Sequence, residues 1–170
     1  VREKLPRGQY SMLMSMYDRL GGCPLQWSKN ADGDLGNGQK PAATKPTLHQ
    51  GRYYDGQLRI DQTLFAICPS NQQLHPSNVF IFELYRLADT EAMQDEVVAW
   101  GALPMCDSQF SVVKGIFKIP LLNGRVDRTI DLHYSLETMY REDLSRWLSN
   151  LYLEVRHLPR KMLDPSGRKE

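Results

Sequence analysis

The stretch "VFIFELYRL" (residues 79–87) is followed, after a short polar loop, by "EVVAWGALPM" (residues 96–105). The first stretch is aromatic, β-branched and nearly all apolar, which is typical of a central strand with both faces covered. The second has the character of another strand, and Trp100 follows three apolar residues within it. We therefore predict that the two stretches are neighbouring strands of an antiparallel β fold with Trp100 in its core.

A further strand is predicted near the start of the chain, over residues 10–16. Met and Leu are also good helix formers, so a helix is the competing interpretation. The regular alternation of Ser with Met or Leu and the Gly21-Gly22 turn that follows favour a strand. The residues predicted to share one face are Tyr10, Met12, Met14 and Met16.

Shorter period-two patterns predict the remaining strands. Asp55-Gly56 lies between two β-prone pieces within residues 51–67 and indicates a hairpin. Residues 115–124 alternate apolar and polar side chains, and Pro120 within them suits a sheet edge or a strand end. Further strands are expected over residues 128–136 and 151–158.

One segment breaks the β rhythm, because its apolar residues recur at steps of four, three, one and three. This spacing predicts a helix over residues 140–150. We expect Leu144 and Leu148 to be buried on its apolar face, and Arg141 and Arg146 to point outward as candidate partner contacts. The apolar stripe comprises Tyr140, Leu144, Trp147, Leu148 and Leu151.

The sum is seven or eight short strands and one late helix, without alternation of strands and helices. That pattern predicts an all-β, antiparallel sandwich. A length of 170 residues suits one domain, which we place at residues 10–159, with a long loop over residues 30–46. Residues 1–9 are expected to form an extension and residues 160–170 a flexible tail.

Composition excludes several classes of function. Lys and Arg total 21 and Asp and Glu total 20, a balance that argues against a nucleic-acid binder. The three Cys have no metal-ligand spacing and predict reduced thiols in a cytoplasmic protein. The chain has no nucleophile elbow, phosphate loop or zinc-protease motif, so we expect no cofactor, no small-molecule substrate and no enzymatic activity. An enzyme fragment would have only four isolated His and one acidic loop in its favour.

The segments "VFIFELYRL", "EVVAWGALPM" and "VVKGIFKIPLLNG" together resemble a C2 domain. The "VVAWG" step is most similar to the divergent C2 modules of lipid kinases and of ciliary and transition-zone scaffold proteins. The resemblance implies an eight-stranded sandwich with functional loops at one end. It also implies a non-enzymatic module of a larger scaffold that docks a protein partner in the cytoplasm, at the cilium or at the cytoskeleton.

Some C2 domains bind calcium through loop carboxylates, since calcium takes six to eight oxygen ligands. The place directly after the central strand, however, holds Tyr85, Arg86 and Leu87 instead of acids. We therefore expect a solvated loop and calcium-independent function. The remaining calcium candidates are Asp18, Asp89, Glu91 and Asp95.

Other C2 domains bind anionic lipid through a basic strand face, because Lys and Arg near a membrane surface each contribute about 1 kcal/mol. Membrane docking of this kind is the alternative function. Basic residues that fit it, or a protein partner, surround the end of the last predicted strand. They are Arg156, Arg160 and Lys161.

Overall fold

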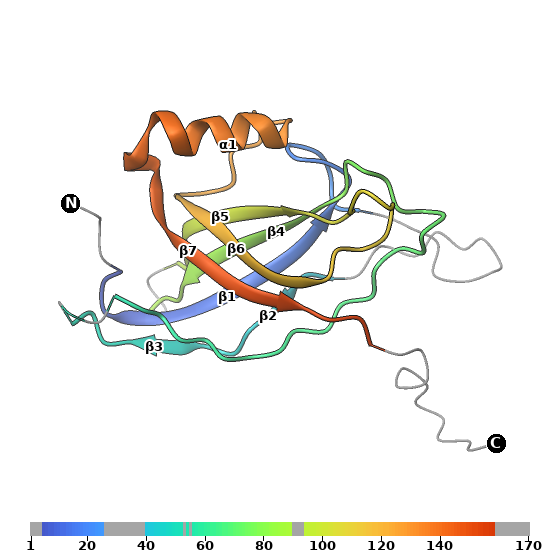
Figure 1. Ribbon diagram of the computed structural model, residues 1–170. Helices are drawn as coiled ribbons and strands as arrows, with labels where there is room; N and C mark the ends of the chain where they lie inside the picture. Colours follow the sequence, from blue (N-terminus) through green and yellow to red (C-terminus); the bar gives the residue numbers. More distant parts are fainter. Residues whose placement is uncertain (1–4, 26–39, 53, 55, 90–93, 159–170) are drawn as a thin grey trace, which may run out of the picture.

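The computed structural model describes residues 5–25, 40–52, 54, 56–89 and 94–158 (Figure 1). Seven strands in this part form one antiparallel sheet in the order β2-β1-β4-β5-β6-β7, with β3 also paired to β1. The prediction of an all-β, antiparallel fold is confirmed. The strands are β1 Gly8–Tyr17, β2 Ala42–Ala43, β3 Thr47–His49, β4 Val79–Arg86, β5 Glu96–Pro104, β6 Gly115–Asn123 and β7 Trp147–Val155.

Strand β4 is the centre of the sheet, as its sequence predicts. It pairs with β1 along its whole length, from Tyr17 opposite Val79 to Tyr10 opposite Arg86, and with β5 on its other side. Its alternating side chains enter two different hydrophobic clusters. Both faces of β4 are therefore covered, which explains why its sequence is almost continuously apolar.

The sheet bends sharply between β5 and β6. These strands pair only at Ala99 with Asn123 and at Trp100 with Leu122. Continuing the ladder would place Pro120 opposite Ala102, but proline has no N–H to donate. Beyond this point β6 leaves β5, and β6 and β7 cross in front of β4 and β1 (Figure 1).

The first core lies between the β6–β7 hairpin and the rest of the sheet. It contains buried side chains from β1, β4, β5 and β6. Leu151, Leu153 and Val155 of β7 are only half-buried against it. The core is therefore least closed along β7.

A second core lies on the opposite face of β4 and β5, beneath helix α1, His133–Glu142 (Figure 1). Trp100 of β5 is 1% exposed there, and Leu136 of α1 is fully buried. Leu122 of β6 belongs to the same cluster. The prediction that Trp100 lies in the core is confirmed.

Among the described residues, no helix is long and apolar enough to cross a bilayer.

The predicted helix over residues 140–150 is wrong, and so is the predicted strand over residues 128–136. Helix α1 begins at His133. Leu136 and Met139 are almost one helical turn apart and pack together into the second core, which favours a helix over a strand here. It ends at Asp143, which adopts an extended conformation with φ −135° and ψ 92°. The Asp143 carboxylate accepts from the N–H of Ser145 and so starts a separate 3-10 turn, Leu144–Arg146 (η1).

The apolar stripe that suggested one helix combines two different elements. Leu144 belongs to η1 and is 68% exposed, so its predicted burial is wrong. Leu148 lies in β7 and is half-buried against the first core. A bulge between Leu121 and Leu122 of β6 leaves Leu148 as an extra, unmatched residue of β7. The extra residue moves the alternation of β7 by one position, so the spacing of the apolar residues resembles that of a helix.

The predicted hairpin within residues 51–67 is also not formed by strands. Described residues 56–70 contain no strand. Leu58, Ile60 and Leu64 instead pack as an irregular segment against the first core. Gln62 holds this segment in place, because its side chain accepts from the Lys45 N–H at 2.7 Å and donates to the Lys45 carbonyl at 3.1 Å. Asp55 lies outside the described residues.

The β1 edge of the sheet is closed by short strands and a side-chain bond. Strands β2 and β3 pair with β1, and between them the Thr44 N–H donates to the Met12 carbonyl at 2.9 Å. The Thr44 hydroxyl accepts from the Met12 N–H at 2.9 Å. Part of the predicted long loop thus forms β2, while residues 30–39 of it lie outside the described residues.

Candidate interaction surface

The outward side of the β6–β7 hairpin carries exposed apolar and charged side chains together. Alternation along β6 turns Ile119 into the first core and Lys118 outward, and in β7 Tyr152 points outward in the same way. The register places Lys118 directly opposite Tyr152, and Ile116 opposite Glu154. We call this surface the hairpin face; it comprises Ile116, Lys118, Tyr152, Glu154 and Arg156.

Two large apolar side chains of the hairpin face are open to solvent. Ile116 is 82% exposed and Tyr152 is 68% exposed. The Lys118 ammonium lies 5.9 Å from the centre of the Tyr152 ring, within the range of a cation–π contact. Lys118 has no ion pair within the described part of the chain.

Glu154 and Arg156 form the only two-bond ion pair found on the described surface. The Arg156 guanidinium donates to both carboxylate oxygens of Glu154, at 2.7 and 2.8 Å. These bonds lower the pKa of the Glu154 carboxyl and raise the pKa of Arg156. Their charges cancel locally, so Lys118 supplies the unbalanced positive charge of the hairpin face.

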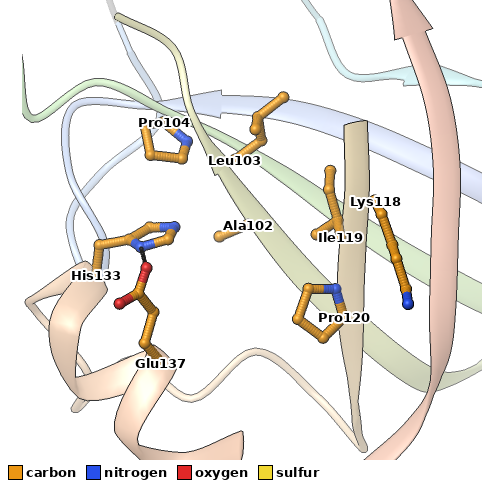
Figure 2. Close-up of a pocket in the computed structure, with 8 residues that line it drawn as sticks. All are labelled: Ala102, Leu103, Pro104, Lys118, Ile119, Pro120, His133 and Glu137. Carbon is orange, nitrogen blue, oxygen red and sulfur yellow. Dashed lines mark ion pairs between the residues drawn. The ribbon is translucent and has the colours of Figure 1, made fainter. Parts of the chain in front are cut away.

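A pocket of about 280 Å³ adjoins the hairpin face where β6 leaves β5 (Figure 2). Its walls are mostly apolar, and Lys118 and Pro120 belong both to this pocket and to the outward side of β6. His133 and Glu137 of α1 close one side, with His133 Nδ1 3.7 Å from Glu137 Oε1. His133 Nε2 is buried and has no hydrogen-bond partner among the described residues. The other lining residues are Ala102, Leu103, Pro104 and Ile119.

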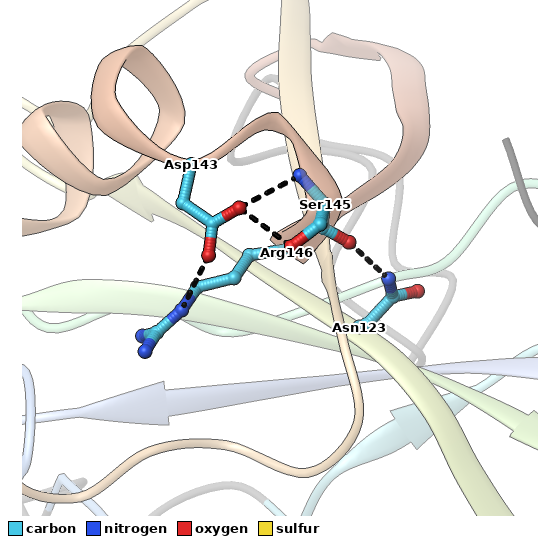
Figure 3. Close-up of polar contacts among 4 residues, drawn as sticks. All are labelled: Asn123, Asp143, Ser145 and Arg146. Carbon is cyan, nitrogen blue, oxygen red and sulfur yellow. Dashed lines mark hydrogen bonds and ion pairs between the residues drawn. The ribbon is translucent and has the colours of Figure 1, made fainter. Parts of the chain in front are cut away.

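The end of α1 is fixed to the end of β6 by polar contacts (Figure 3). The Asn123 side chain donates to the Ser145 carbonyl at 2.9 Å. Asp143 accepts from the Ser145 N–H at 3.0 Å and lies 3.5 Å from the Arg146 guanidinium. The bonds from Ser145 lower the pKa of the Asp143 carboxyl. Beside them, Arg125 and Arg146 line a second pocket of about 200 Å³.

The structure separates the basic residues that the sequence suggested as partner contacts. Arg141 is exposed in the last turn of α1, and Arg146 in η1 is engaged by Asp143. Arg156 follows the far end of β7, a strand roughly 26 Å long at 3.3 Å per residue. Arg160 and Lys161 lie outside the described residues. Of the three basic residues that the structure describes, Arg141, Arg146 and Arg156, only Arg156 belongs to the hairpin face.

The calcium candidates are likewise separated. Asp18 follows the end of β1 beside Val79, whereas Asp89 and Asp95 lie beyond Arg86 at the opposite end of β4. That strand spans roughly 23 Å. Asp18 already accepts from the Cys23 N–H at 2.8 Å, and Asp95 from the Ala88 N–H at 2.9 Å. Within the described ranges no three His, Cys, Asp or Glu residues are grouped to hold a metal ion, and Glu91 lies outside them.

One carboxylate that sequence patterns did not single out is Glu83. It lies in the middle of β4, on the outer face of the sheet, opposite Leu13 and Trp100. Burial raises the pKa of its carboxyl above the ordinary value of 4.5, and the nearby Arg128 guanidinium opposes that rise. A charged residue inside an otherwise apolar strand could have singled out Glu83 in the sequence. Its neighbours could not be predicted in the same way, because they depend on the loop that brings Arg128 over β4.

The hairpin face was also not recognisable as a unit from the sequence. Lys118 and Arg156 are far apart along the chain, so their positions in the sequence did not group them. The pairing of β6 with β7 brings them together with Ile116 and Tyr152.

No protein-family model matches this chain, and a search of curated proteins finds no match to it.

Proposed function

We propose that this chain is a divergent C2-like β-sandwich that works as a non-enzymatic interaction module, docking a protein partner without calcium. The observation that supports it is the hairpin face, where Ile116 and Tyr152 are exposed beside Lys118, which has no ion pair among the residues that the structure describes. Burying such a side chain fully stabilises a complex by about 1.5–3 kcal/mol. A contiguous exposed apolar patch with polar residues at its rim is typical of a docking surface.

The layered arrangement supports the C2-like reading. The hairpin of β6 and β7 lies over β1, β4 and β5 with a hydrophobic core between the layers. Bending one antiparallel sheet in this way produces the two faces of a sandwich. The sequence resemblance alone is the basis for proposing a module of a larger scaffold, of the kind found in ciliary proteins.

The chemistry of the hairpin face defines the partner that would fit it. Ile116 and the Tyr152 ring favour an aliphatic or aromatic side chain, and the Lys118 ammonium favours a carboxylate next to it. The pocket beside Lys118 and Pro120 offers apolar walls for that side chain. We infer that the partner presents an apolar residue adjoining Asp or Glu.

An array of peptides that vary in apolar and acidic residues tests this partner chemistry. We expect peptides with an apolar residue beside Asp or Glu to bind the native chain, and Lys118→Glu to weaken that binding about tenfold, equivalent to ~1.4 kcal/mol. Tyr134→Glu is the matched control, because Tyr134 is 74% exposed on α1, away from the hairpin face. Equal losses in both variants, or no loss in Lys118→Glu, would contradict the proposed surface.

Binding of anionic phospholipid is the second candidate function. Arg125 and Arg146 line the second pocket and Arg141 lies near it in the sequence, and each such residue contributes about 1 kcal/mol near an anionic surface. Asp127 lines the same pocket, however, and Asp143 lies beside Arg146, so the positive charge is largely offset. Sedimentation with phosphatidylserine vesicles distinguishes the two functions, since only the lipid-binding module would pellet.

Calcium should leave the thermal stability of the chain unchanged. The described candidate acids, Asp18 on one side and Asp89 and Asp95 on the other, lie at opposite ends of β4, so they cannot together supply one calcium ligand set. A site at a hundred times its dissociation constant would add about 2.7 kcal/mol of stability. The measurement is the melting temperature with millimolar calcium and with chelator. A calcium-dependent rise that disappears in Asp89→Asn with Asp95→Asn would refute calcium independence.

A further inference from the structure

Strand β7 ends the sheet, and its outer side has no neighbouring strand in the described part of the chain. It is nine residues long and contains neither proline nor lysine, the residues that commonly block pairing at a sheet edge. The β1 side is different, because β2, β3 and Thr44 cover it. Within the described residues, one edge of the sheet is thus covered and the other has no paired strand.

The position of Pro120 shows which backbone groups of β7 face outward. A Cβ on Gly101 of β5 would lie 2.7 Å from the Pro120 carbonyl oxygen, so that carbonyl points toward β5 and away from β7. Asn150, opposite Pro120, is therefore in a pair without mutual hydrogen bonds. By alternation, the N–H and C=O groups of Asn150, Tyr152 and Glu154 point away from β6.

The side chains of β7 also leave the core incompletely closed. Leu151, Leu153 and Val155 pack against the first core, but no residue of β7 is fully buried. A strand added along this edge would cover them with its own inward side chains. The added strand must alternate apolar residues inward with polar residues outward.

Residues 150–155 of β7 have this pattern. We propose that two copies of the chain associate through antiparallel pairing of their β7 strands about a two-fold axis. When the strands overlap fully, Leu151 lies opposite Leu151 of the second copy, and Asn150 opposite Tyr152. Asn150 and Tyr152 then exchange backbone hydrogen bonds across the interface.

Charge and side-chain chemistry favour this register. Glu154, the charged residue of β7, lies opposite Leu148 of the second copy, so no like charges face each other. The facing leucines extend the first core across the interface. A two-fold axis gives each copy the same contacts, as in most homodimers. This association uses backbone groups at the edge of β7, whereas the partner proposed for the hairpin face would contact side chains; Tyr152 and Glu154 contribute to both surfaces.

Asn150→Pro tests the edge directly. Proline is tolerated where the N–H of an edge strand faces away from its neighbour, so the ladder between β6 and β7 should survive. We expect the native chain to sediment as a dimer at micromolar concentration and Asn150→Pro as a monomer with an unchanged circular dichroism spectrum. In hydrogen exchange, the Tyr152 amide should be protected in the native chain and exchange rapidly in the variant.

Two further variants make the result decisive. Ile116→Glu changes the exposed face of β6 but not the edge of β7, so it should remain dimeric. Tyr152→Lys places a lysine on the edge and should give a folded monomer even if Asn150→Pro does not fold. A native chain that is monomeric at these concentrations overturns the proposal. So does a dimer that persists in Tyr152→Lys or that dissociates in Ile116→Glu.

Discussion

Trp100→Ala should lower the free energy of unfolding by about 3–5 kcal/mol, the usual cost of removing a buried aromatic side chain. Trp100 is 1% exposed and belongs to the second core with Leu122 and Leu136. The three residues come from three different elements, β5, β6 and α1, so the cavity would loosen the helix as well as the sheet. Denaturant unfolding followed by circular dichroism measures the effect.

Tyr134→Ala is the control for that measurement. It removes another aromatic side chain, but one that is 74% exposed on α1, so its effect should be within about 0.5 kcal/mol. If Trp100→Ala unfolds at the denaturant midpoint of the native chain, Trp100 does not lie beneath α1. The assignment of the second core would then be wrong.

Gly101→Ala should lower the free energy of unfolding by about 1–3 kcal/mol, although it adds one methyl group. That methyl would lie 2.7 Å from the Pro120 carbonyl oxygen and 2.9 Å from Leu121 Cδ2. The closest atom belongs to the backbone of β6, so relief requires β6 to move away from β5. Thermal unfolding measures the loss of stability, and hydrogen exchange should show reduced protection of the Leu122 amide.

The matched control for this glycine is Gly56→Ala. No atom lies within 4 Å of the position that a Cβ would take at Gly56. Its effect on stability should therefore be small, and replacing glycine can even stabilise by restricting the unfolded chain. If both variants lose the same stability, close packing of β5 against β6 is not the cause.

The longer strands could be predicted from sequence, because each carries its own local signal: alternation in β1 and β6, and a nearly continuous apolar run in β4. β4, β5 and β6 occur where "VFIFELYRL", "EVVAWGALPM" and "GIFKIPLLNG" indicated them. The helix could not be placed in the same way. Asp143 ends α1 through a side-chain bond to Ser145, and a bulge then offsets β7 by one residue. Spacing alone cannot distinguish that combination from one longer helix.

The candidate surface depends on register, which local patterns do not encode. Lys118 and Tyr152 meet only because β6 and β7 pair in one particular alignment. Asp18 and Asp89 were grouped by analogy with calcium-binding loops, but antiparallel pairing of β1 with β4 separates them. Residue types could therefore be nominated from sequence, whereas their neighbours required the structure.

From the short ladder between β5 and β6 we expect two units of the molecule to open separately. Only two residue pairs join these strands before Pro120 interrupts the ladder, whereas β6 and β7 pair along nearly their whole length. The β6–β7 hairpin can consequently detach as a unit while β1, β4 and β5 remain paired, since little hydrogen bonding has to break. Such partial opening exposes the first core without global unfolding. Because the ladder between β5 and β6 is interrupted at Pro120, we expect exposure of the first core to require less free energy than unfolding of the whole chain.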